Sequence, residues 1–171
     1  MVRKVARETA ECMSDFKTNF VEKYKINISN KLTSELVGKI FETRCESIFS
    51  KSLGYAVRRE ASDKDPDLYF TRINRPLEVK LTSTLTAWTG GEFSKRPFDY
   101  LLVSWGGSFD EYFVALVRLV KKDWKSNYQK KFYGPSYSAK KLYERKDKKV
   151  FMGDFKVNES RGSVKIVRER I

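Results

Sequence analysis

The sequence contains no histidine and only two cysteines, Cys12 and Cys45. Without histidine the chain can build neither a histidine general base nor a zinc site of Cys and His ligands. Ser-His-Asp and Cys-His hydrolase mechanisms are excluded for the same reason. Two cysteines in segments with helical patterns do not suggest a disulfide framework, so we expect reduced, partly buried thiols. Any catalysis must therefore use carboxylates, lysine, tyrosine, or a metal ion held by oxygen ligands.

Long apolar runs are also missing from the sequence. No stretch approaches the length of a membrane-spanning helix, and the first residues, MVRKVARETAEC, lack the apolar segment of a secretory signal. We therefore expect a cytoplasmic protein with no membrane partner. Hydrophobic residues make up 40% of the 171 residues, which is enough for a single domain with its own core.

Positive charge is what the sequence has in excess. Lysine and arginine number 35 against 22 aspartate and glutamate, which gives a net charge of +13. Such an excess favours a polyanionic partner, most often nucleic acid. An acidic membrane surface is the alternative, but neither end of the chain has a basic amphipathic helix with a clean apolar face.

Hydrophobic periodicity predicts two helices followed by strands. Residues 3–25 have apolar side chains at helical spacing, and a second helix is expected from an N-cap at Ser34 to Leu53, with Gly54 as its stop. Residues 83–97 are expected to form a loop. This order predicts one α/β domain with a mixed sheet flanked by helices. The expected strands are residues 55–60, 68–71, 77–81, 100–105, 112–117, 150–155 and 163–168, with a short helix at 138–143.

The segment DPDLYFTRINRPLEVKL, residues 65–81, predicts a β-hairpin with charged residues inside its second strand. With a turn centred on the Ile73–Asn74 peptide bond, Asp67 faces Lys80, and Glu78 lies diagonally one pair along. The apolar residues between them alternate to the other face, which is expected to be buried in the core. Two carboxylates and one ammonium group are therefore predicted to lie together on one face.

This grouping has a chemical use, because hard divalent cations prefer carboxylate oxygens together with water and phosphate. Asp67 and Glu78 could hold Mg2+, with the backbone carbonyl of Val79 as a third ligand, and Mn2+ is expected to substitute. The ion would neutralise a scissile phosphate and acidify a water molecule. Lys80 would orient that water or stabilise the developing charge. The alternative is a hairpin whose charged residues are only structural.

The pair Pro66-Asp67 followed by Glu78-Val79-Lys80 resembles the PD-(D/E)XK signature of the restriction-endonuclease-like nucleases. In that superfamily an upstream helix usually contributes a further acidic residue. Glu42 matches this place in the sequence, and Glu46, one turn further on, is the alternative. The resemblance implies four catalytic side chains: Asp67, Glu78, Lys80 and Glu42.

The resemblance spans residues 36–105 and implies a restriction-endonuclease-like mixed β-sheet flanked by helices. The N-terminal helix and the basic C-terminal segment are additions to that core. Within that superfamily the chain most resembles a type II restriction endonuclease. This resemblance implies a Mg2+-dependent enzyme, expected to be a homodimer, that cuts double-stranded DNA at a short specific sequence and leaves 5'-phosphate and 3'-hydroxyl ends. A Holliday-junction resolvase or repair nuclease, and a non-catalytic DNA-binding module, are the two alternatives.

Two basic segments are candidates for DNA contact. Ser94, Lys95 and Arg96 follow the predicted catalytic strand and form either a solvated loop or a DNA-contacting one. A basic, aromatic stretch over residues 121–133 begins with Lys121, Lys122 and Lys125. That stretch is either a nucleic-acid surface or an amphipathic helix with a solvated lysine face.

Overall fold

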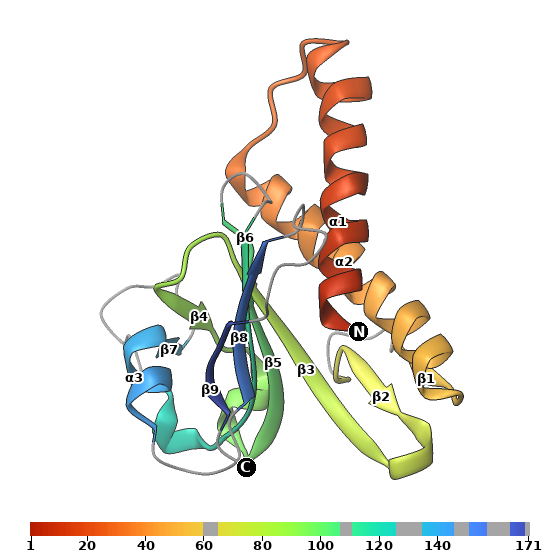
Figure 1. Cartoon of the computed structure of the whole chain (residues 1–171). Coiled ribbons are helices and arrows are strands. Elements are labelled where there is room, and N and C mark those ends of the chain that lie inside the picture. Colours follow the sequence, from red (N-terminus) through yellow and green to blue (C-terminus); the bar gives the residue numbers. More distant parts are fainter. Residues whose placement is uncertain (60–64, 107–110, 126–134, 146–150, 157–164, 170–171) are drawn as a thin grey trace.

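A mixed β-sheet with helices against one face forms the body of the computed structural model, which describes residues 1–59, 65–106, 111–125, 135–145, 151–156 and 165–169 (Figure 1). The seven strands of this sheet have the order β1-β2-β3-β5-β6-β8-β9. Strands β3 and β5 are parallel, and the other neighbouring pairs are antiparallel. The predicted α/β class with a mixed sheet and flanking helices is confirmed. The strands are β1 (Val57–Arg58), β2 (Leu68–Phe70), β3 (Arg75–Thr82), β5 (Phe98–Ser104), β6 (Glu111–Leu119), β8 (Phe151–Lys156) and β9 (Lys165–Glu169).

Two N-terminal helices form a hairpin that projects beyond the sheet (Figure 1). Helix α1 (Val2–Phe16) continues into the π-helical turn η1 (Lys17–Glu22), and α2 (Asn30–Leu53) returns to the body. The predicted N-cap at Ser34 is wrong. Ser29 has an extended backbone and accepts a hydrogen bond from the Leu32 N–H at 3.2 Å, so the helix begins five residues earlier. Gly54 ends the helix at φ 69°, as predicted.

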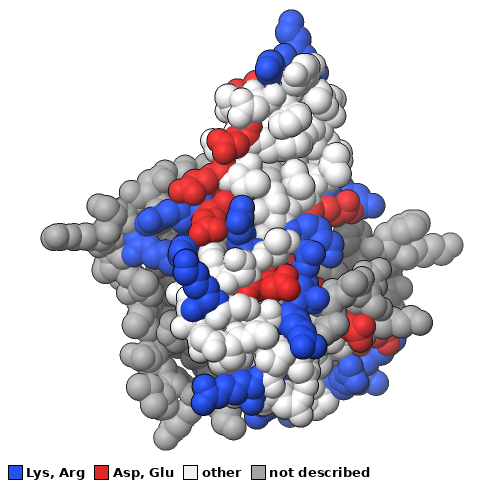
Figure 2. Space-filling model, turned by 90° about the vertical axis from the view of Figure 1, so that its right-hand side faces the viewer, with Lys and Arg blue, Asp and Glu red and all other residues white. Residues whose placement is uncertain are grey.

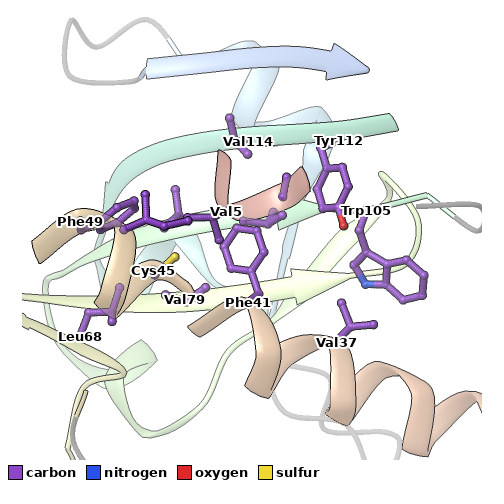
Figure 3. Packing of buried hydrophobic residues seen from close by; sticks show 14 of the residues in the cluster. Val5, Val37, Phe41, Cys45, Phe49, Leu68, Val79, Trp105, Tyr112 and Val114 are labelled. Carbon is purple, nitrogen blue, oxygen red and sulfur yellow. The ribbon is translucent and has the colours of Figure 1, made fainter. Parts of the chain in front are cut away.

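The alternation of side chains along the central strands creates two cores. In β5, Leu101 and Val103 point to the helix side, whereas Tyr100 and Leu102 point to the opposite side. Figure 3 shows the helix-side core, where Phe41 of α2 meets side chains of α1 and of the sheet. The alternation in the hairpin predicted one face buried in the core, and Leu77 and Val79 lie in this helix-side core.

A small sheet covers the opposite face of the large one. It consists of β4 (Ala87–Thr89) and β7 (Ser136–Ser138), which pair antiparallel beside helix α3 (Ala139–Glu144) and the 3-10 turns η3 (Glu92–Lys95) and η4 (Lys121–Asp123). The prediction of a loop over residues 83–97 is therefore wrong in part. Trp88 is fully buried, and its indole N–H donates to the carbonyl of Val103 at 2.9 Å, which fixes this segment on the large sheet.

The hairpin register differs from the prediction by two residues. Leu68 pairs with Leu77, so Asp67 lies opposite Glu78 rather than Lys80. The cause is the connection, a 3-10 turn (η2, Thr71–Ile73) followed by a left-handed residue. A shift of two residues leaves every side chain on its predicted face, because the side-chain period of a strand is two. No helix within the described ranges has the length and apolarity that crossing a bilayer requires.

Candidate active site

Asp67 lies at the point where strand β2 stops pairing with β3. The last paired residues are Leu68 and Leu77. Beyond them, the Asp67 carboxylate replaces the strand backbone as acceptor for the Val79 N–H, at 2.8 Å. The N–H and C=O of one strand residue point to the same side of the strand. The carbonyl of Val79 therefore faces Asp67, as a metal-ligand role for this carbonyl requires.

Glu78 and Lys80 lie on the same face of β3, as the alternation predicted. The Lys80 Nζ lies 2.5 Å from Oε1 of Glu78, and the two side chains are 24% and 5% exposed. The other carboxylate oxygen of Glu78, Oε2, is buried and has no hydrogen-bond partner among the described residues. Burial raises the pKa of Glu78, and the charge of Asp67 adds to this, while Lys80 acts in the opposite direction.

Helix α2 brings Glu42 within electrostatic reach of Asp67 and Lys80. Its side chain is 12% exposed and forms an ion pair with Lys39, with 3.3 Å between Nζ and Oε2. Burial raises the pKa of Glu42, and the negative charge of Asp67 is the second cause. Lys80 lowers the same pKa slightly, so Glu42 lies within electrostatic reach of both Asp67 and Lys80.

The alternative helix carboxylate, Glu46, contacts Arg59. It accepts a hydrogen bond from the Arg59 backbone N–H at 3.3 Å and lies 4.0 Å from the Arg59 side-chain Nε. These contacts tie Glu46 to the segment after β1. Between the two helix carboxylates, the structure therefore favours Glu42.

The acidic cluster, Glu42, Asp67 and Glu78, creates a negative field that reaches neighbouring groups. Cys45 is buried, and the charges of Glu42 and Asp67 add to the effect of burial in raising the pKa of its thiol. Cys12 and Cys45 are both free thiols, as expected. Two carboxyl groups with raised pKa values beside a lysine are typical of a functional site.

No group of three acidic or cysteine side chains in the described part of the chain stands close enough to hold a metal ion. Lys80 donates a hydrogen bond to Oε1 of Glu78, so this oxygen already has a partner. The donor chemistry nevertheless suits a hard divalent cation. Oε2 of Glu78 is buried without a donor, and a cation would relieve the repulsion that helps to raise the pKa values of Glu42 and Glu78.

The structure separates the predicted DNA-contacting residues around η3. Ser94 is 4% exposed, and its hydroxyl donates to the Gly91 carbonyl at 2.6 Å, so it stabilises the turn. The expectation that Ser94 faces solvent or DNA is therefore wrong. Lys95 and Arg96 are exposed. Lys95 pairs with Glu92 at 2.8 Å, and the guanidinium carbon of Arg96 lies 5.2 Å from the centre of the Phe93 ring.

The second basic segment packs beside the first. Lys121, Lys122 and Lys125 are exposed, whereas Trp124 between them is buried. Trp124 lies directly against Gly90, since a Cβ atom on Gly90 would be 2.9 Å from two of its ring atoms. Residues 121–125 do not form the alternative amphipathic helix, and residues 126–133 of the predicted stretch lie outside the described residues.

The two basic segments meet at one end of the sheet, where Phe98 of β5 pairs with Leu119 of β6. Tyr100, two residues further along β5, is the register partner of Glu78, which corresponds to about 7 Å along the strand. On the side of the molecule that carries β1, β2 and α2, Figure 2 shows acidic side chains with lysine and arginine around them. A polyanion bound there would meet both kinds of charge.

Two features of this region were not found from the sequence. Tyr100 lies beside Glu78 only because β3 and β5 are parallel neighbours, and pairing between strands so far apart leaves no local signal. A hollow of about 640 Å³ is lined by Phe70, Leu77 and Leu116, together with Asp99, which pairs with Arg75 and Arg118. This hollow is separate from the acidic cluster, because its lining includes none of Glu42, Asp67 and Glu78.

No protein-family model, no curated protein and no solved structure matches the chain.

Proposed function

We propose that this chain is a Mg2+-dependent endodeoxyribonuclease that cuts double-stranded DNA at a short specific sequence, as type II restriction endonucleases do. The observation that carries the proposal is the convergence of Asp67, Glu78 and Lys80 on the open side of β3, with Glu42 supplied by α2. A merely structural hairpin gives no reason to bury Glu78 to 4% exposure beside the carboxylate of Asp67.

Asp67, Glu78 and the carbonyl of Val79 are the groups that would hold the ion. When bound, Mg2+ supplies charge neutralisation at the scissile phosphate and a more acidic water. Lys80 stabilises negative charge that develops on the phosphate, because its partly exposed ammonium group can reach a phosphate oxygen at the surface. Glu42, whose pKa is raised, can accept a proton from water or hold that water in place.

The DNA backbone would be held by the two basic segments. Lys95, Arg96, Lys121 and Lys122 are exposed at one end of the sheet, and Lys125 is exposed beside them. Together with the net charge of +13, this surface favours binding of a phosphate backbone. Ser94 is not included, because its hydroxyl is used inside the turn.

A second copy of the chain is part of the proposal, since one site per strand needs two sites for a duplex. The projecting helical hairpin offers a surface for this copy: Phe20 and Tyr24 are 52% and 61% exposed, and Phe20 contacts both the Phe16 and the Tyr24 ring. Sedimentation of the chain under cleavage conditions tests this part. A fully active monomer would contradict it.

The proposed function is tested by incubating plasmid DNA with the protein and Mg2+, with and without EDTA. Discrete linear fragments that disappear with EDTA, and that carry 5'-phosphate and 3'-hydroxyl ends, are expected. Cleavage restricted to branched DNA would replace the sequence-specific function with a junction resolvase or repair nuclease. DNA binding without cleavage under any divalent cation would leave a non-catalytic DNA-binding module.

A further inference from the structure

Tyr100 lies directly beside Glu78 on the neighbouring strand. The two residues are register partners in the parallel pair β3–β5, so their side chains leave the sheet on the same face. Tyr100 is fully buried and Glu78 is 4% exposed. Two edge-on aromatic contacts fix the tyrosine ring, with centroid distances of 5.2 Å to Trp124 and 6.1 Å to Phe98.

Both residues leave a polar atom unpaired in this buried place. The hydroxyl of Tyr100 and Oε2 of Glu78 have no hydrogen-bond partner in the described part of the chain. One atom carries a proton to donate and the other is a carboxylate oxygen that accepts, so the two needs are complementary. Buried polar atoms in native proteins are almost always paired with protein groups or with water.

The two groups are close enough to influence each other without direct contact. The negative charge of Glu78 raises the pKa of the Tyr100 hydroxyl, in addition to the larger effect of burial. A polar gap of this kind between a donor and an acceptor is commonly filled by one water that bonds to both. The ring of Trp124 contacts the Tyr100 ring, and its buried indole N–H also lacks an acceptor among the described residues.

We propose that Tyr100 is a positioning residue for Glu78, donating a hydrogen bond to Oε2 through one buried water and thereby fixing the orientation of the carboxylate. This inference rests on the proposed function in one respect, namely that Glu78 holds a divalent cation. Tyr100 itself contacts neither the cation nor DNA. It restricts rotation of the carboxylate. A residue that orients a metal ligand in this way typically changes metal affinity by about 10-fold or more.

The test is a titration of the full chain with Mn2+ in the absence of DNA, in which electron paramagnetic resonance measures the bound ion. Tyr100→Phe removes only the hydroxyl and is expected to weaken Mn2+ binding roughly 10-fold, with an unchanged affinity for DNA in EDTA. Tyr112→Phe is the matched control, because Tyr112 is a buried tyrosine on the opposite face of the sheet. It is expected to leave Mn2+ affinity within about two-fold of wild type, since its side chain lies in the helix-side core and Glu78 points to the other face.

A double variant keeps the inference independent of general effects on folding. In a Glu78→Gln background, Tyr100→Phe is expected to have no further effect on Mn2+ affinity, because the residue acts through the Glu78 carboxylate. Equal losses from Tyr100→Phe in both backgrounds, or an equal loss from Tyr112→Phe, would overturn the inference.

Cleavage of DNA is read separately, so the two proposals fail in different ways. Wild-type protein that binds Mn2+ with the expected Tyr100 dependence but never cuts DNA would overturn the proposed function and leave the role of Tyr100 standing. Wild-type protein that cuts DNA while Tyr100→Phe binds Mn2+ normally would overturn the role of Tyr100 alone. Wild-type protein that binds no Mn2+ would overturn both.

Discussion

The Asp67 carboxylate accepts a hydrogen bond from the backbone N–H of Val79, at 2.8 Å, where a partner strand would otherwise pair. This contact does two things at once. It ends the pairing of β2 with β3, and it keeps that side of β3 open beside Glu78 and Lys80. The site and the edge of the hairpin are therefore one structural feature, and the loss of Asp67 should affect both.

Glu42 and Glu46 provide a matched pair on the same helix. Glu42→Gln is expected to slow DNA cleavage by about 10²-fold or more, because it removes a carboxylate near Asp67 and Lys80. Glu46→Gln is expected to leave the rate within a few-fold of wild type, because Glu46 is bound to Arg59. Single-turnover rates with excess enzyme provide the measurement. A reversed order of the two variants would assign the helix carboxylate to Glu46.

The pH dependence of stability follows from the raised pKa values of Glu42 and Glu78. Above their ordinary value of 4.5, the folded state holds more protons at these two groups than the unfolded state does. Their contribution to stability is therefore fully present below about pH 4.5 and is lost as the pH rises through the raised pKa values. The metal-free protein should lose stability over that window.

Urea unfolding in EDTA at a series of pH values measures this effect. Glu42→Gln should flatten the decline relative to wild type, because the substituted side chain does not ionise. Glu35→Gln, an exposed position on the same helix, serves as the control and should follow the wild-type curve. Parallel curves for Glu42→Gln and wild type would contradict the burial of Glu42 beside Asp67.

The basic end of the sheet makes a prediction about salt. Lys95→Ala and Lys121→Ala should each weaken DNA binding and reduce the slope of log affinity against log salt by about 1 if each removes one phosphate contact. Ser94→Ala is the contrasting variant. It should leave DNA affinity unchanged and lower the free energy of unfolding by about 1 kcal/mol, because its hydroxyl bonds the Gly91 carbonyl. An unchanged salt slope in both lysine variants would place the DNA elsewhere.

Gly90 and Gly91 test the packing that holds the two basic segments together. A Cβ atom at Gly90 would lie 2.9 Å from the Cβ atom of Ser94 and from the Trp124 ring, whereas nothing lies within 4 Å of one at Gly91. Gly90→Ala should therefore lower the free energy of unfolding by about 1–3 kcal/mol. Gly91→Ala should change it far less. Thermal or urea unfolding of both variants gives the comparison, and equal effects would contradict this arrangement.

Local patterns were enough to predict which side chains share a face. The alternation of Glu78, Val79 and Lys80 depends only on the period of a strand, and it was correct even though the hairpin register was not. The register depends on the backbone of the turn, where Asn74 adopts φ 51° after a 3-10 turn. Nothing in the residue pattern distinguishes this turn from a tighter or wider one.

Contacts between distant segments could not be predicted from the sequence. Tyr100 and Glu78 become neighbours through a parallel strand pair, and Ser94 becomes buried because Trp124 packs against its turn. The choice between Ser29 and Ser34 as a helix cap failed for a different reason. Both residues are good caps, and only the extended backbone at Ser29 decides between them.

Lys80 gives the most direct test of the central claim, that the charged face of β3 is a catalytic site. The measurement compares plasmid cleavage in Mg2+ by wild type, Lys80→Ala and Lys31→Ala, with DNA affinity in EDTA measured alongside. Lys31 is an exposed lysine of α2 that pairs with Glu35, and it controls for the loss of one positive charge. We predict that Lys80→Ala loses at least about 10²–10³-fold in rate while it still folds and binds DNA, and that Lys31→Ala keeps most of its activity. A fully active Lys80→Ala enzyme would contradict the assignment.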